Sequence, residues 1–252
     1  ADPAADLAQA ENALQNIEKM KPEKLVLIST VDVYPAPVDV YEDTPAGGEN
    51  APAYGANRLK LEEWVRRQWP AALVLRLPGL YGRGLKKNFI FDALTLTPSM
   101  LTEAKFAELA GEELVAQSYE PAKPGFYKVK ALDAKGKEKL RAFFAQNDFN
   151  ALRFTDSRSV FQFYDLGRLW GDIEACLKAE LPLVNLAAQP IEAGALYSEV
   201  FGKPIENHLE KPPAQYDMRT RFDGILGGAD GYLQSRGDVV AGEKQLAAEW
   251  QL

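Results

Sequence analysis

The stretch that decides the fold spans residues 24–84 and reads KLVLISTVDVYP at 24–35, APAYGANRLKLEEWVRRQW at 51–69 and PAALVLRLPGLYGRG at 70–84. Residues 25–28 and 72–77 are short apolar runs bounded by breakers, the pattern of strands buried on both faces of a parallel sheet. A helical segment lies between them, which predicts a strand, loop, helix and strand with a right-handed crossover. Ligands of such sheets gather beyond the carboxyl ends of the strands, here at Thr30 and at residues 77–80.

The predicted helix carries Tyr54 and Arg58 one turn apart on one face, shortly after Pro52, which suits the first turn of a helix. A guanidinium beside a phenol would favour the phenolate and lower the pKa of Tyr54, which eases proton transfer near neutral pH. Thr30 could hydrogen-bond the same substrate oxygen. The alternative is that the Tyr54 ring only packs and that Arg58 is a solvated charge.

Three segments, ISTVDVYP, YGANRLKLE and RLPGLYGRG, resemble in order and spacing the second half of the extended short-chain dehydrogenase/reductase family. That family includes nucleotide-sugar epimerases, dehydratases and reductases, and it binds NAD or NADP on a Rossmann domain. The resemblance implies an α/β fold: a Rossmann-like doubly wound parallel sheet, partial in this chain, with a smaller α+β substrate lobe. It also implies NAD or NADP as the cofactor and a nucleotide sugar as the small-molecule substrate.

The resemblance assigns catalytic roles to Thr30, Tyr54 and Arg58. Thr30 matches the catalytic Ser/Thr, Tyr54 the catalytic tyrosine, and Glu62 the acidic residue that often follows it. Arg58 lies where the family has lysine, and this exchange is not conservative because arginine is bulkier, planar and fork-shaped. Two hypotheses stay open: an enzyme that works with Arg58, or a non-catalytic homologue that binds or regulates. The cofactor-binding residues implied by the resemblance are Ser29, Arg58, Leu77 and Pro78.

Two further residues match substrate-binding positions of the family. Asn88 lies where members often place an asparagine on the nucleotide-sugar diphosphate. Arg158 begins a segment in which the family's arginine meets that diphosphate, a contact suited to a planar bidentate donor. The alternatives are a helix-capping Asn88 and an Arg158 paired with Asp156 or Asp165. Gly79 replaces an asparagine of the family segment, so the sugar specificity stays open.

The domain organisation is predicted from the order of these segments. The Rossmann-like part comprises residues 1–84 and 160–188, and the substrate lobe comprises residues 85–159 and 189–252. An insertion at about 98–156 is expected to contain a helix at 101–110, a hairpin of 113–119 with 126–132, and a helix at 137–145. This insertion is interpreted either as a small satellite core or as a lid or partner surface beside the site.

The sequence opens without methionine, and no strand in it is followed by the glycine-rich fingerprint that cradles a dinucleotide pyrophosphate. A parallel sheet without its first strands would expose edges that proteins normally cover. We therefore expect a truncated version of a longer protein, with a natural remnant as the alternative.

Composition narrows the classes of function. The net charge of -7 and the pI of about 5.0, without any Lys/Arg cluster, argue against nucleic-acid partners. The single cysteine, Cys176, excludes an internal disulfide and fits a cytoplasmic location. His208 is the only histidine, so no metal site is expected. No apolar run is long enough to span a membrane. A homodimer through the helix of Tyr54 is implied by the resemblance.

Overall fold

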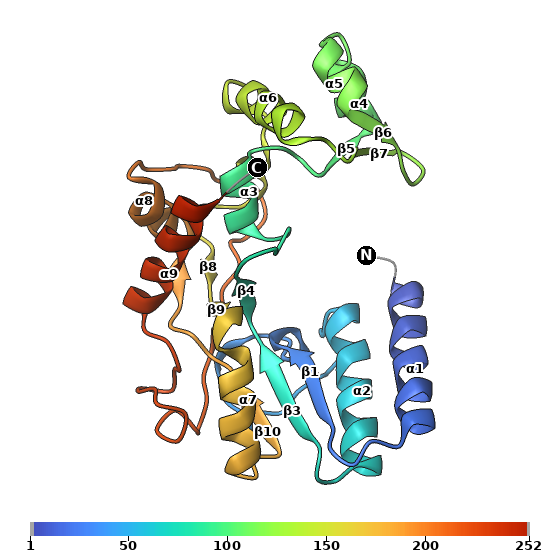
Figure 1. The fold of residues 1–252 in the computed structure, drawn as a ribbon, viewed down its shortest axis with the longest axis vertical. Helices are drawn as coiled ribbons and strands as arrows, with labels where there is room; N and C mark the ends of the chain where they lie inside the picture. The colour runs from blue at the N-terminus through green and yellow to red at the C-terminus, as the bar shows by residue number, and fades with distance from the viewer. Residues whose placement is uncertain (1–2, 251–252) are drawn as a thin grey trace.

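The computed structural model describes residues 3–250, and its centre is a parallel sheet of three strands (Figure 1). The order is β1-β3-β10, with β1 at Val26–Thr30, β3 at Leu73–Leu77 and β10 at Leu183–Asn185. Ser29 and Asn185 are the partners of Arg76 on either side of β3. The predicted strands at 25–28 and 72–77 are therefore confirmed as neighbours in a parallel sheet.

Helices cover both faces of this sheet. On one face, α2 (Ala53–Gln68) packs Leu61 and Val65 against Leu27 and Val74, and α1 (Pro3–Met20) lies along α2. On the other face, α7 (Leu169–Lys178) packs against the opposite side of β3 and β10. Figure 1 shows the two groups of helices on opposite sides of the strands. This is the doubly wound arrangement that the sequence predicts.

Strands β3 and β1 differ in how much of their surface is covered. All five residues of β3 are buried, as expected of a strand with helices on both faces. In β1, Leu27 and Ser29 face α2 and are buried, whereas Ile28 points to the other face and is 44% exposed. Among the described residues 3–250, β1 pairs only with β3, so its second edge carries no ladder hydrogen bonds. A dimer through α2 stays a prediction.

A second group of elements, called here the second body, lies beyond the carboxyl ends of the strands of the parallel sheet. Its apolar core includes Phe89, Ile90, Leu196 and Val239. Its elements are β4 (Gly79–Tyr81) parallel to β9 (Phe163–Asp165), β8 (Val160–Phe161) antiparallel to β11 (Ile191–Glu192), α3 (Phe89–Thr95), α8 (Ala193–Phe201) and α9 (Arg236–Glu249). A small pair, β2 (Val38–Val40) with β12 (Asp217–Met218), joins the loop after β1 to the late part of the chain. The short helices are η1 (Val31–Val33), η2 (Ala151–Phe154) and η3 (Leu166–Arg168).

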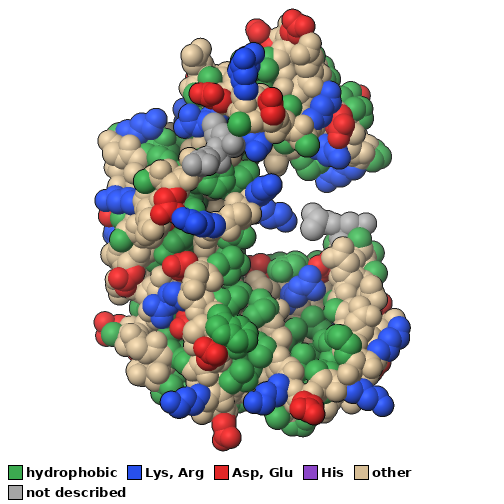
Figure 2. All heavy atoms as spheres, in the orientation of Figure 1, with side chains coloured by type: hydrophobic (Ala, Val, Ile, Leu, Met, Phe, Trp, Pro, Cys, Tyr) green, Lys and Arg blue, Asp and Glu red, His purple; other side chains and the backbone are tan. Residues whose placement is uncertain are grey.

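The insertion forms a lobe at the far end of the molecule from the parallel sheet (Figure 1). Its antiparallel sheet has the order β5-β7-β6, and three helices pack on a core that includes Leu101, Val115, Leu140 and Phe144. The elements are β5 (Met100–Thr102), α4 (Glu103–Leu109), α5 (Glu113–Ser118), β6 (Tyr119–Pro121), β7 (Phe126–Val129) and α6 (Ala134–Ala145). Figure 2 shows the molecule hollowed between this lobe and the body below it. No described helix is long and apolar enough to cross a membrane.

One expectation within the insertion was wrong. The hairpin was predicted to begin at residue 113, but its first strand begins at Tyr119, and the residues before it form α5. In a helix, Glu113 and Gln117 lie one turn apart, and the Gln117 amide donates a hydrogen bond of 2.8 Å to Glu113. Val115 is fully buried against the lobe core. Packing against the lobe core therefore determines the helical conformation of Glu113–Ser118, whose local sequence pattern did not distinguish a helix from a strand.

A buried ion pair joins α2 to the sheet. Arg76 on β3 and Glu62 on α2 are 3% and 1% exposed, and the Arg76 Nη2 to Glu62 Oε2 distance is 2.7 Å. The Arg76 Nε also donates to Glu62 Oε1 at 3.1 Å, and the Ser29 hydroxyl donates to the same oxygen at 2.5 Å. Arg76 Nη1 donates to the Tyr34 hydroxyl at 2.6 Å. Each charge is thus both paired and hydrogen-bonded, the condition under which a buried ion pair is tolerated.

Replacing Glu62 by alanine leaves the Arg76 guanidinium buried without its counter-ion. We expect Glu62→Ala to lower the free energy of unfolding by about 3–5 kcal/mol, measured by urea denaturation followed by circular dichroism. The double variant Glu62→Met/Arg76→Met should cost less than the single one, because no charge is left unpaired.

The matched control is Glu108→Ala, since Glu108 is 61% exposed in a surface pair with Lys105. Its effect should stay within about 0.5 kcal/mol. Equal effects of Glu62→Ala and Glu108→Ala would contradict the structural role given to the buried pair.

Candidate functional site

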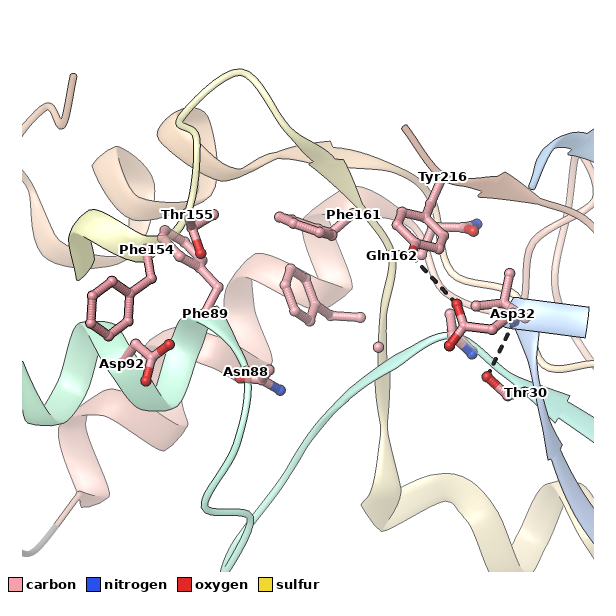
Figure 3. A pocket seen from close by; sticks show the side chains of 14 residues that line it. Thr30, Asp32, Asn88, Phe89, Asp92, Phe154, Thr155, Phe161, Gln162 and Tyr216 are labelled. Carbon is pink, nitrogen blue, oxygen red and sulfur yellow. Dashed lines mark hydrogen bonds between the residues drawn. The ribbon is translucent and has the colours of Figure 1, made fainter. Parts of the chain in front are cut away.

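A cleft of ≈ 490 Å³ lies beyond the carboxyl ends of β1 and β3, between the parallel sheet and the second body. The position is the one expected for ligands of an open parallel sheet. Figure 3 shows its side chains, contributed by segments far apart in the sequence. The lining residues are Thr30, Val31, Asp32, Pro78, Gly79, Asn88, Phe89, Asp92, Phe154, Thr155, Phe161, Gln162, Phe163 and Tyr216.

Thr30, Asp32 and Tyr216 form the polar end of the cleft (Figure 3). Thr30 caps η1, and its Oγ1 accepts a hydrogen bond of 3.2 Å from the backbone N–H of Asp32. The Thr30 hydroxyl can still donate its own proton. The Tyr216 hydroxyl lies 3.5 Å from Asp32 Oδ1. Burial raises the pKa of Asp32, and the hydrogen bonds with Thr30 and Tyr216 oppose that shift.

On the opposite side of the cleft, Asn88 caps α3 and Asp92 lies within this helix. Asn88 has a φ of 82°, and its Oδ1 accepts hydrogen bonds from the N–H groups of Ile90 at 3.0 Å and Phe91 at 3.3 Å. Its Nδ2 donates to the carbonyl of Leu80. This is the helix-capping alternative noted for Asn88, and a contact with a substrate diphosphate stays a prediction.

Asp92 is the second carboxyl group in the cleft. Burial raises the pKa of Asp92 to about 7, and no other cause contributes to this shift. The aromatic rings of Phe154 and Phe161 also line the cleft, and Phe154 is 44% exposed. The cleft therefore combines exposed aromatic surface with a carboxyl group that changes charge near neutral pH.

The four predicted cofactor-binding residues lie in three different environments. Pro78 lines the cleft. Ser29 and Leu77 lie inside the sheet, where the Ser29 hydroxyl donates to Glu62 and Leu77 is 5% exposed in the apolar core. Arg58 is on α2, outside the set of cleft-lining residues. Contacts of these residues with a cofactor stay predictions.

Tyr54 and Arg58 are neighbours one turn apart, as their spacing predicts. The Arg58 guanidinium carbon lies 4.7 Å from the centroid of the Tyr54 ring, over its face. Arg58 Nη2 also forms an ion pair of 2.7 Å with Asp6 Oδ1 on α1. Tyr54 is 42% exposed, and neither residue is among those that line the cleft. The structure therefore brings Thr30 and Pro78 to the cleft and holds Tyr54 and Arg58 at the start of α2.

Gly55 fixes how closely α2 approaches the polar end of the cleft. A Cβ atom at this position would lie 1.7 Å from the backbone oxygen of Asp32 and 3.2 Å from the backbone nitrogen of Val33. The first turn of α2 is therefore in direct contact with the backbone of η1, and only glycine permits that contact. This contact sets the distance between Tyr54 and the segment that carries Asp32.

Arg158 pairs with Asp156, which is one of the alternatives predicted for it. Its Nε and Nη2 donate to the two carboxylate oxygens of Asp156 at 2.9 and 2.6 Å. The hydrogen bond with Arg158 holds the pKa of Asp156 well below its usual range. Arg158 is not among the cleft-lining residues, so its contact with a diphosphate stays a prediction.

Sequence reasoning missed several polar residues of the cleft, among them Asp32, Asp92 and Tyr216. Asp32 follows Thr30 by two positions, and the rule that ligands gather at strand ends could have identified it. Asp92 and Tyr216 carried no local signal, because folding alone brings them to the cleft. Within residues 3–250, no group of three or more His, Cys, Asp or Glu residues is arranged to hold a metal ion.

Comparisons with known proteins address the fold. No protein-family model matches this sequence, and no curated protein matches it. The WbmG enzyme of Bordetella bronchiseptica, solved with NAD and UDP, is similar at a TM-score of 0.62 and 15% identity, over 99% of this chain and 68% of that one. A dTDP-glucose 4,6-dehydratase from Bacillus anthracis, solved with NAD, gives 0.58 and 12%, over 98% and 67%. RMD from Pseudomonas aeruginosa, solved with NADPH, gives 0.58 and 14%, over 99% and 74%.

These similarities define the class of fold. It is a Rossmann-like α/β fold with a parallel sheet and a second body at the carboxyl ends of the strands. More specifically, it is the fold shared by the dTDP-glucose 4,6-dehydratase, WbmG and RMD. The resemblance stated from the three sequence segments is confirmed at the level of the fold. The chain spans 67–74% of the length of the three structures named above.

The contact at Gly55 yields a prediction about stability. Gly55→Ala introduces a Cβ that overlaps the Asp32 carbonyl, so α2 has to move away from η1. We expect a loss of about 3 kcal/mol or more in the free energy of unfolding, at the upper end of overpacking effects. Urea denaturation monitored by circular dichroism measures it.

Gly171→Ala is the matched control, because Gly171 lies in α7 and a Cβ there meets no atom within 4 Å. This substitution should leave stability unchanged or raise it by up to about 1 kcal/mol, since alanine favours helix. A Gly55→Ala protein as stable as Gly171→Ala would refute the close contact.

Proposed function

We propose that this chain forms the substrate side of an NAD(P)-dependent nucleotide-sugar epimerase, dehydratase or reductase. The observation that carries the proposal is the cleft at the carboxyl ends of β1 and β3, which combines a threonine hydroxyl with aromatic walls. Stacking on aromatic side chains is a general means of binding a nucleobase. The cleft volume of ≈ 490 Å³ falls in the range of small-molecule sites.

The cofactor is proposed from the solved structures of the same fold, which contain NAD or NADPH. The residues present fit one end of a dinucleotide: Thr30 retains a free hydroxyl proton, and Pro78 offers an apolar surface beside it. The printed sequence contains no glycine-rich turn to cradle the pyrophosphate. When bound, the nicotinamide would supply hydride exchange with a sugar carbon. We assign its contacts to Ser29, Arg58, Leu77 and Pro78.

The proposed roles of the chain's own residues are to transfer a proton and to position the substrate. Thr30 donates a hydrogen bond to a sugar oxygen, and Tyr54 exchanges a proton with the same oxygen. Arg58, whose guanidinium lies over the Tyr54 ring, holds the phenol in position. Asp32, with its raised pKa, is a further acid or base beside Thr30. This role follows from its position in the cleft.

The diphosphate of the substrate is assigned to Asn88 and Arg158. Asn88 lies at the cleft and caps α3, so its amide can bind an anion only by exchanging one of its present contacts. Arg158 would exchange Asp156 for the diphosphate, since both are bidentate acceptors for a guanidinium.

The alternative function is a nucleotide-sugar binding protein without catalysis. It is supported by the ion pair of Arg58 with Asp6 at 2.7 Å, a structural contact of the guanidinium that requires no catalytic role. It is also supported by the position of Tyr54 and Arg58 outside the set of cleft-lining residues. Binding of a nucleotide sugar without turnover would favour this function.

The proposal is tested by calorimetry of the protein with UDP-glucose, dTDP-glucose, NAD and NADP, followed by NMR of the sugar products. Tyr54→Phe should lower turnover by about 10²-fold or more, because it removes the exchangeable proton, and should leave nucleotide-sugar binding measurable. Tyr127→Phe in the insertion is the matched control, and it should retain turnover.

Arg58→Lys separates the two functions. A rise in turnover supports a protein whose catalysis has decayed, whereas a collapse supports an enzyme adapted to arginine. If none of the four ligands binds, the proposed function is wrong.

Asp92 gives the cleft an expected pH dependence. Its folded pKa of about 7 means that the carboxyl group is neutral below that pH and charged above it. A bound diphosphate would be repelled by the charged form, so we expect the affinity for UDP-glucose to fall about tenfold as the pH rises through 7. Calorimetry between pH 6 and pH 8 measures the change.

Asp92→Asn removes this titration and should give an affinity that does not change over the same range. Asp39→Asn is the matched control, since Asp39 is 69% exposed and lies outside the cleft. It should retain the wild-type pH dependence. A wild-type affinity independent of pH would show that the diphosphate lies away from Asp92.

A further inference from the structure

A second and larger cavity, of ≈ 870 Å³, lies between the insertion and the C-terminal helix α9. Its walls come from the loop after β4, from α3, from the segment after β7, from α6 and from α9. None of its lining residues lines the cleft at the strand ends. Phe91 of α3 faces this cavity, and the adjacent Asp92 faces the cleft, so α3 forms a partition between the two.

The charge of this cavity is opposite to that of the chain. Four cationic side chains line it, against one carboxylate, Glu249, in a chain of net charge -7. Arg83 is paired with Glu249 at 2.5 Å, and the Lys130 Nζ donates to the Gln117 carbonyl at 2.6 Å. Lys86 and Lys137, the other two, make no ion pair or side-chain hydrogen bond within residues 3–250. Two ammonium groups are therefore available to an anion.

The cavity also has an apolar and aromatic wall. Leu140 and Leu246 line it together with Phe91 and Trp250, whose rings meet edge-on with centroids 5.8 Å apart. The Trp250 Nε1 is buried and has no hydrogen-bond acceptor among the described residues. A buried indole N–H normally has a partner, and an oxygen of a bound molecule could supply it.

We propose that this cavity binds a small anionic amphiphile. Its acidic group, a carboxylate or a phosphate or sulfate ester, contacts Lys86 and Lys137. Its aryl or short acyl part packs on Phe91 and Trp250, and an oxygen of the ligand accepts from the Trp250 indole. This ligand is chemically distinct from the nucleotide sugar proposed for the cleft. The inference concerns other residues and does not rest on the proposed function.

The test uses two fluorescent probes of similar size, the anion 8-anilinonaphthalene-1-sulfonate and the neutral N-phenyl-1-naphthylamine. Lys86→Gln/Lys137→Gln should weaken binding of the anionic probe about five- to tenfold, because two charge contacts are lost, and leave the neutral probe unchanged. Lys178→Gln/Lys203→Gln, with the same change of net charge outside the cavity, is the matched control and should bind both probes as the wild type does.

Trp250→Phe removes the indole N–H and keeps an aromatic ring, and it should also weaken the anionic probe. Decyl phosphate and decanoate should displace this probe, with the stronger competitor identifying the preferred acidic group, while UDP-glucose should not. Circular dichroism confirms that each variant is folded. Displacement of the probe by UDP-glucose, or equal affinities for the two double-lysine variants, would overturn the proposal.

Discussion

The ion pair between Glu62 and Arg76 is the interaction on which the rest of the structure depends. Arg76 lies at the centre of the sheet, opposite Ser29 on one side and Asn185 on the other. Glu62 reaches it from α2, and the paired carboxylate also accepts from Ser29. One carboxylate therefore connects the helix to two strands.

This connection has a consequence for the cleft. Apolar contacts such as those of α2 with the sheet are non-directional and tolerate small displacements along the strands, whereas a bidentate ion pair fixes one position. With α2 fixed at Glu62, its first turn meets η1 at Gly55, where the Asp32 carbonyl leaves no room for a side chain. The position of Asp32 in the cleft is therefore determined by a contact about two turns away on the same helix.

The sequence predicted the elements that have strong local patterns and missed the features that folding alone creates. The strands of the parallel sheet and the helix after Pro52 were identified because apolar runs and helical spacing are local properties. Tyr216 reaches the cleft beside Asp32, 184 positions away in sequence, and no local pattern signals that approach. Glu243 is fully buried in α9, where burial raises its pKa to about 8, although a glutamate in a terminal helix indicates an exposed face.

Helix α3 separates the cleft at the strand ends from the second cavity. Successive residues of a helix are rotated by about 100°, so Phe91 and Asp92 necessarily face different sides. Asn88 fixes that orientation, because its amide caps the helix and also donates to the Leu80 carbonyl of β4. The result is a cleft with carboxyl groups on one side of α3 and a cavity with ammonium groups on the other. The cleft repels an anionic ligand less while burial keeps the Asp92 carboxyl group protonated, whereas the second cavity attracts anions through groups that stay charged at neutral pH.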